Sequence, residues 1–242
     1  KNLGPTIPLV GDIKSIFDRL LQENISIDTS NWIETLQDIK KSTVDHRVFS
    51  DKLVNPMLLV QHLSEKMDDD AIYVADVGQN QLWSADNYVM KNGRFLTSGG
   101  MGTMGYSIPA GIGAKMCTPD NQVVVVCGDG SFQMTSEELA AAFLDHAPVK
   151  IAILNNSVYG MVRQWQTLFY EHHYSQTNLL DGEAHGADGA AALADGDAPL
   201  EVPDFIKLAE AYGCVGIRAF TEEEAIAIRW HMSGYDDAAR SY

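Results

Sequence analysis

The sequence predicts an α/β fold with an open, mostly parallel sheet flanked by helices, and two observations lead to that prediction. Residues 123–127 and 151–154 are continuous apolar runs of the kind buried on both faces in a parallel sheet. The segment between them carries helical signals, so strand, helix and strand follow one another. This order indicates a right-handed βαβ unit, in which ligands bind beyond the carboxyl ends of the strands.

The same alternation begins near residue 53. Residues 56–66 have a proline at the start and apolar residues at helical spacing, which predicts a helix, and residues 71–77 predict a further strand. Thr135 is followed three residues later by Glu138, which is the pattern of a capping box. We therefore expect a helix from Thr135 to about residue 146.

The first 52 residues have a different organisation. Residues 6–10 predict a short strand, residues 12–21 an amphipathic helix, and residues 23–52 a helix-bearing linker. One strand and one helix cannot bury their own apolar faces. We therefore expect residues 1–52 to be the tail of a preceding α/β domain with its linker.

Residues 53–242 are predicted to form one ligand-binding domain. Within it, residues 180–203 are rich in Gly, Ala and Asp and have no apolar periodicity, which predicts a disordered insertion. A helix is expected from about Glu222. The apolar strand that should follow this helix is not recognisable in residues 230–242.

Composition excludes several classes of partner. The formal net charge of −16 would repel the phosphates of nucleic acid and an anionic membrane surface. The sequence contains no run of about 18 apolar residues, so no membrane-spanning helix is predicted. The cysteines, Cys117, Cys127 and Cys214, lack CxxC spacing and fit a reducing compartment, so we expect a cytoplasmic protein.

Candidate oxygen ligands follow two of the predicted strands. The motif Gly-Asp-Gly-Ser at residues 128–131 follows the strand at 123–127, and Asn155 and Asn156 follow the strand at 151–154. A carboxylate and an amide oxygen at the edges of neighbouring strands are ligands for Mg²⁺ or Ca²⁺, and Mg²⁺ completes its shell with phosphate oxygens. The glycines allow backbone N–H groups to approach those oxygens. The sequence therefore predicts a metal-bridged diphosphate site.

The motif running from GDGS to NN resembles that of thiamine-diphosphate enzymes. Three further stretches, SGGMGTMGYSIPAGIGA, MVRQWQTLFY and VPDFIKLAEAYGCVGIR, resemble acetohydroxyacid synthase, the acetolactate synthase large subunit. This resemblance spans about residues 54–225, and PLVGDIKSIFDRLL resembles the end of that family's central domain more faintly. It implies thiamine diphosphate and magnesium as cofactors, with FAD in the full-length enzyme at a site mostly absent from this chain.

The resemblance implies a role for each residue of the diphosphate site. The side chains of Asp129 and Asn156 and the backbone carbonyl of Val158 would bind the metal. Two loops would hold the diphosphate: Gly128, Gly130 and Ser131 on one side, and Gly78, Gln79 and Asn80 on the other. Many relatives have histidine at the position of Asn80, which weakens that contact.

The resemblance also assigns residues around the organic part of the cofactor. The catalytic positions are Met104, which would support the bent thiamine, and Gly102, whose carbonyl would accept a hydrogen bond from the 4′-amino group. Met161 would pack beside the pyrimidine, and Trp165 would line the substrate entrance and favour 2-oxobutyrate as acceptor. By residue type alone, Met104 and Trp165 would be core residues, and the surrounding motifs favour the family roles.

The activity implied is decarboxylation of pyruvate and condensation with a second 2-oxo acid, in branched-chain amino-acid biosynthesis. The family forms dimers or tetramers, with a possible regulatory subunit. Its glutamate against the pyrimidine comes from the N-terminal domain of a partner subunit, which no segment before residue 54 resembles, so we expect no turnover from the isolated chain. Two alternatives stay open: another thiamine-diphosphate decarboxylase, oxidase or carboligase, and a binding fragment that no longer catalyses.

Overall fold

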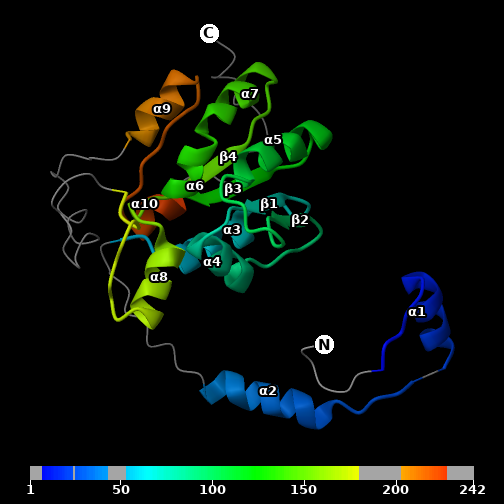
Figure 1. Cartoon of the computed structure of the whole chain (residues 1–242). Coiled ribbons are helices and arrows are strands. Elements are labelled where there is room, and N and C mark those ends of the chain that lie inside the picture. The colour runs from blue at the N-terminus through cyan, green and yellow to red at the C-terminus, as the bar shows by residue number, and fades with distance from the viewer. Residues whose placement is uncertain (1–6, 24, 43–52, 180–202, 228–242) are drawn as a thin grey trace. The chain divides into compact units, whose positions relative to one another are not determined.

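The computed structural model describes residues 7–23, 25–42, 53–179 and 203–227 (Figure 1). The chain divides into two units, Lys1–Val48 and Phe49–Tyr242, which are described separately. Most of the predicted insertion at residues 180–203 and the segment from residue 228 onward lie outside the described residues. Among the described helices, none combines the length and the apolar character needed to cross a bilayer.

Two helices lie in the described part of the first unit, α1 (Ile13–Gln22) and α2 (Ser30–Ser42). Helix α1 begins where the sequence predicts it, because the Asp12 carboxylate accepts a hydrogen bond of 2.9 Å from the backbone N–H of Ser15. The strand expected at residues 6–10 is not formed over its described residues, 7–10. A strand needs a hydrogen-bonding neighbour, and the first unit has none among its described residues.

The second unit is built on a parallel sheet, of which four strands lie in the described residues. The strands are β1 (Ile72–Ala75), β2 (Arg94–Thr97), β3 (Val123–Gly128) and β4 (Lys150–Leu154). Their order in the sheet is β2-β1-β3-β4. This confirms the predicted α/β class with a parallel sheet.

Eight helices of the second unit are described around this sheet, in the order α3 (Pro56–Lys66), α4 (Gln79–Asn87), α5 (Ser107–Cys117), α6 (Asp129–Met134), α7 (Leu139–Leu144), α8 (Gly160–Phe169), α9 (Phe205–Ala211) and α10 (Glu222–Ala227). Figure 1 shows α3 and α4 on one side of the sheet and α5 to α7 on the other. The domain therefore has three layers, with the sheet in the middle.

Two apolar cores lie on opposite faces of the sheet, because the side chains of each strand alternate between the faces. Tyr73 and Val124 pack in one core with Leu63 of α3. Val125, the next residue of β3, packs in the other core with Ile112 of α5. All five side chains are buried, which explains why β1 and β3 consist of uninterrupted apolar residues.

One predicted helix boundary is wrong. A helix was expected from Thr135, but α6 already begins at Asp129, and a short 3₁₀ turn (Ser136–Glu138) separates it from α7. The Thr135 hydroxyl does not cap a helix, because it donates to the carbonyl of Gly105 at 2.9 Å. A tertiary contact thus replaces the capping box that the local sequence favours.

The strand order locates the crevice of the domain. From β1 the chain passes to β2 on one side, and then returns to β3 and β4 on the other side. The reversal falls between β1 and β3. Ligands of open α/β sheets bind at such a point, beyond the carboxyl ends of the strands. Residues 76–80 and 128–131 follow these two strand ends.

Candidate functional site

Most of the predicted site residues line one hollow at the carboxyl ends of β1 and β3, which we call the inner hollow and which encloses about 60 Å³. They are Gly78, Gln79, Asn80, Met104, Gly128, Asp129, Ser131, Asn156, Val158 and Met161. Three predicted residues are not part of its lining. Gly130 is buried in α6, Gly102 is exposed, and Trp165 is 57% exposed on α8.

Asp129 is a buried carboxylate with only 1% of its surface exposed. Its Oδ2 accepts a hydrogen bond of 2.8 Å from the backbone N–H of Ser157. Among the described residues, no cationic side chain forms an ion pair with it. Burial raises the pKa of Asp129 to about 6, although backbone hydrogen bonds, the one from Gly130 foremost, act in the opposite direction. A buried carboxylate of this kind is stabilised by a bound metal ion.

The second candidate ligand lies in the loop after β4. Ser157 has a positive φ of 57°, so the chain turns sharply between Asn156 and Val158. The side-chain oxygen of Asn156 accepts a hydrogen bond of 3.2 Å from the backbone N–H of Val158. Residues 177–179 return to this loop and bond to residues 157–159 through backbone hydrogen bonds of 2.8 and 2.9 Å. The loop is therefore fixed by its own turn and by its pairing with residues 177–179.

The turn after β1 forms the opposite wall. Gly78 has a φ of 129°, a conformation that side chains rarely adopt. The amide nitrogen of Asn80 donates to the carbonyls of Asp76 and Val126 at 3.0 and 2.8 Å. The Asn80 amide hydrogens thus tie the β1–α4 turn to β3.

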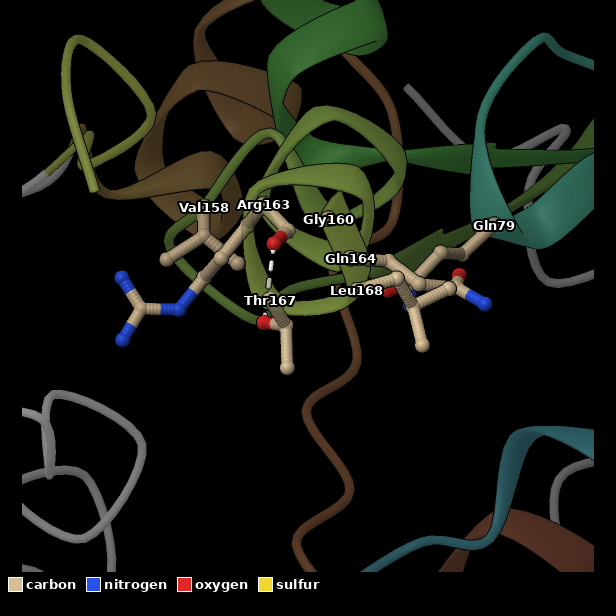
Figure 2. A pocket seen from close by; sticks show the side chains of 7 residues that line it. All are labelled: Gln79, Val158, Gly160, Arg163, Gln164, Thr167 and Leu168. Atoms are coloured by element: carbon tan, nitrogen blue, oxygen red, sulfur yellow. Dashed lines mark hydrogen bonds between the residues drawn. The ribbon is translucent and has the colours of Figure 1, made fainter. Parts of the chain in front are cut away.

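A second hollow, the outer hollow, adjoins the first and encloses about 290 Å³. Its lining consists of Gln79, Val158, Gly160, Arg163, Gln164, Thr167 and Leu168, of which the first three also line the inner hollow. In Figure 2 the side chains of Gln79 and Gln164 lie together, while Arg163 points the opposite way. Nε2 of Gln79 donates a hydrogen bond of 3.1 Å to Oε1 of Gln164. The Arg163 guanidinium lies 3.9 Å from the centre of the Tyr174 ring, which explains its direction.

Sequence reasoning missed several residues of this region. Trp83 and Tyr159 line the inner hollow, and Gly160 lines both hollows. A Cβ atom at Gly160 would lie 2.1 Å from Oε1 of Gln79, so a side chain there would require the Gln79 side chain to move. A glycine four residues after Asn156, at the start of a helix, is a signal that could have identified this close approach.

Residues 76–232 match the family described as "Thiamine pyrophosphate enzyme, C-terminal TPP binding domain". Thiamine pyrophosphate is another name for thiamine diphosphate. The chain belongs to this family of cofactor-binding domains, whose cofactors are thiamine diphosphate and magnesium. The buried Asp129 carboxylate, which has no cationic partner among the described residues, fits a metal-bound cofactor.

Particular relatives refine this assignment. Acetolactate synthase from Mycobacterium leprae is 39% identical over 236 residues, a match that covers 94% of this chain and 35% of the relative. The acetolactate synthase large subunit from Lactococcus lactis subsp. lactis is 41% identical over 209 residues, covering 86% and 33%. The chain therefore spans about a third of the length of these relatives.

A solved structure shows the same fold. The thiamine diphosphate-dependent 4-hydroxybenzoylformate decarboxylase of Rhodococcus jostii RHA1 superposes with a TM-score of 0.60 at 25% sequence identity. The superposition covers 76% of this chain and 31% of the decarboxylase. The three-layer architecture is thus that of a thiamine-diphosphate enzyme.

Proposed function

We propose that this chain is the cofactor-binding, C-terminal part of an acetolactate synthase large subunit. The observation that carries the proposal is the common hollow in which Asp129, Asn156 and Val158 meet. In this proposal the two side chains and the Val158 carbonyl bind Mg²⁺. The identity to acetolactate synthases over almost the whole chain supports the particular enzyme.

The diphosphate would be bound between two loops. Gly128, Gly130 and Ser131 would offer backbone N–H groups from the start of α6, and Gly78 and Gln79 would approach from the β1 side. At Gly130 a Cβ atom would lie 2.7 Å from the Tyr159 ring, so any other residue there would displace that ring. For Asn80 we propose an indirect contribution, since its amide hydrogens already bond to two carbonyls.

The organic part of the cofactor would be positioned by residues on the loop before α5 and on α8. Bound thiamine diphosphate supplies a nucleophilic carbon and accepts the electrons released when a 2-oxo acid loses CO₂. Met104 and Met161 would exclude water from that carbon. The Gly102 carbonyl would accept a hydrogen bond from the 4′-amino group of the cofactor and so orient that group.

The proposed reaction is decarboxylation of pyruvate and condensation with pyruvate or 2-oxobutyrate, as a step of branched-chain amino-acid biosynthesis. Trp165, beside Gln164 on α8, would select the acceptor at the substrate entrance. For the whole protein we propose a cytoplasmic homo-oligomer, with FAD and a regulatory subunit as further partners. The cysteines at 117, 127 and 214 are free thiols, which supports a reducing compartment.

Calorimetric titration of the chain with thiamine diphosphate tests the cofactor site. We expect binding in Mg²⁺, and loss of that binding both in a chelator and in an Asp129→Ala variant. The exposed Asp86 provides a matched control, because Asp86→Ala removes the same group from the surface of α4. Binding that survives in Asp129→Ala would contradict the proposed metal ligand.

Product analysis separates the synthase from the decarboxylase that the structural relative suggests. The chain would be incubated with pyruvate, thiamine diphosphate and Mg²⁺, alone and together with a separately produced amino-terminal part of the Mycobacterium leprae relative. Acetolactate in the mixture would support the synthase. Acetaldehyde would support a decarboxylase instead, and no product despite tight cofactor binding would favour a binding fragment.

A further inference from the structure

Asp76 is a second buried carboxylate at the crevice, and the proposed chemistry does not use it. It directly follows β1, and its side chain is completely buried. Its backbone N–H donates to the carbonyl of Val126 at 2.9 Å, which extends the pairing of β1 with β3. No ion pair to Asp76 is formed within the described part of the chain. Its charge is therefore stabilised by other groups.

Backbone N–H groups provide that stabilisation. Oδ1 of Asp76 accepts hydrogen bonds from Val77 at 2.7 Å and from Gly105 at 3.0 Å. Oδ2 accepts one from Ser107 at 2.9 Å. Ser107 is the first residue of α5, an eleven-residue helix, so the carboxylate also lies at the positive end of a helix dipole. The bonds from Gly105 and Ser107 connect the end of β1 to the loop that carries Met104.

The same loop is held at three further points. The Gly105 carbonyl accepts the hydroxyl hydrogen bond of Thr135 at 2.9 Å. The backbone N–H groups of residues 102–103 donate to the carbonyl and hydroxyl oxygens of Ser98, each at 3.1 Å. Met104 lies between these points and reaches the inner hollow. Its position therefore depends on Asp76 and Thr135 on one side and Ser98 on the other.

We propose that Asp76 is a positioning residue for the organic half of the cofactor. It fixes residues 105–107 against β1, and thereby sets where the Met104 side chain reaches the inner hollow. Asp76 itself does not line the hollow. The inference rests on the proposed function. It adds that the two halves of the cofactor are held independently, the diphosphate by the metal loop and the pyrimidine by a loop that Asp76 anchors.

Comparison of two ligands tests this division of labour. Thiamine diphosphate contacts both halves of the site, whereas inorganic pyrophosphate contacts only the metal half. In Mg²⁺ we expect Asp76→Asn to weaken thiamine diphosphate binding roughly tenfold, because the amide replaces one charge-assisted acceptor by a donor facing an N–H group. Pyrophosphate affinity should stay the same. The exposed control Asp86→Asn should change neither affinity.

Hydrogen exchange of the unliganded chain provides a readout that does not depend on cofactor. In Asp76→Asn we expect the amides of residues 102–107 to exchange roughly tenfold faster, with residues 155–158 unchanged. If Asp76→Asn does not fold, Thr135→Val removes only the hydroxyl bond to Gly105 and should produce a smaller change with the same selectivity.

The possible outcomes separate the two hypotheses. An equal loss of both ligands, or unchanged exchange at residues 102–107, would overturn the role of Asp76. If the unaltered chain binds neither ligand, the proposed function fails, and the exchange rates alone then decide whether Asp76 anchors the loop.

Discussion

Because the Asp129 carboxylate is buried, we predict that the metal-free fold is less stable with Asp129 than with a neutral residue at this position. Its pKa is raised from 3.8 to about 6 by burial. Each pKa unit corresponds to about 1.4 kcal/mol, so ionised Asp129 costs the metal-free fold up to about 3 kcal/mol at neutral pH. Asp129→Asn replaces the carboxylate by a neutral amide that can still accept the hydrogen bond from Ser157.

The sign of the pH dependence follows from the direction of this pKa change. Because the folded state holds the proton more tightly than the unfolded state, wild-type stability falls as the pH rises from about 4 through about 6. The stabilisation by Asp129→Asn should therefore be near zero at about pH 4 and reach up to about 3 kcal/mol above about pH 7. Urea denaturation in a chelator at both pH values measures it, with Asp86→Asn as the control.

Magnesium should reverse the order of stability. Wild-type protein gains stability from any ligand that binds only the folded state. Asp129→Asn should lose most of this gain, because its amide oxygen carries no negative charge to attract the metal ion. A variant that is less stable than wild type in chelator near pH 8, or equally stabilised at both pH values, would refute the argument that burial dominates at Asp129.

Two further predictions concern backbone positions. Gly111→Ala should destabilise the fold by roughly 1–3 kcal/mol, since a Cβ atom there would lie 2.4 Å from Cγ2 of Val125, whereas Gly113→Ala on the same helix meets no atom within 4 Å and should be tolerated; thermal denaturation of both variants checks this. Ser157→Gly should leave stability and metal affinity almost unchanged, but Ser157→Val should lower both by at least about 1 kcal/mol, because a β-branched residue disfavours φ of 57°. Urea denaturation and calorimetric titration with Mg²⁺ measure the two quantities. Equal effects of the two substitutions would contradict the argument that the backbone of residue 157 is strained.

The sequence predicted the elements whose signals are local and strong. The helix at Pro56–Lys66 and the buried strand at Val123–Gly128 lie where proline, apolar spacing and an uninterrupted apolar run place them. The short strand β2 (Arg94–Thr97) was not predicted, because its exposure is uneven and only its pairing with β1 makes it a strand. Tertiary contact likewise decided the start of α6.

The candidate site was predictable in its ligands but not in its supports. A carboxylate and an amide after two strands identify a metal site by residue type and spacing, as with Asp129 and Asn156. Asp76 also follows a buried strand, but its partners Gly105 and Ser107 lie about 30 residues away. Nothing in the local sequence reveals that their backbone N–H groups converge on one carboxylate. The strand order brings them together.

Strand β3 is an interior strand whose length is constrained by its surroundings. Its neighbours β1 and β4 pair with it on either side, and its side chains alternate between the two cores. If an inserted residue followed Val125 in this strand, either Val124 and Val125 would exchange faces or the Asp129 carboxylate would be displaced from its loop. Related sequences should therefore differ by substitutions within Val123–Gly128. Insertions and deletions should occur in the surface connections instead.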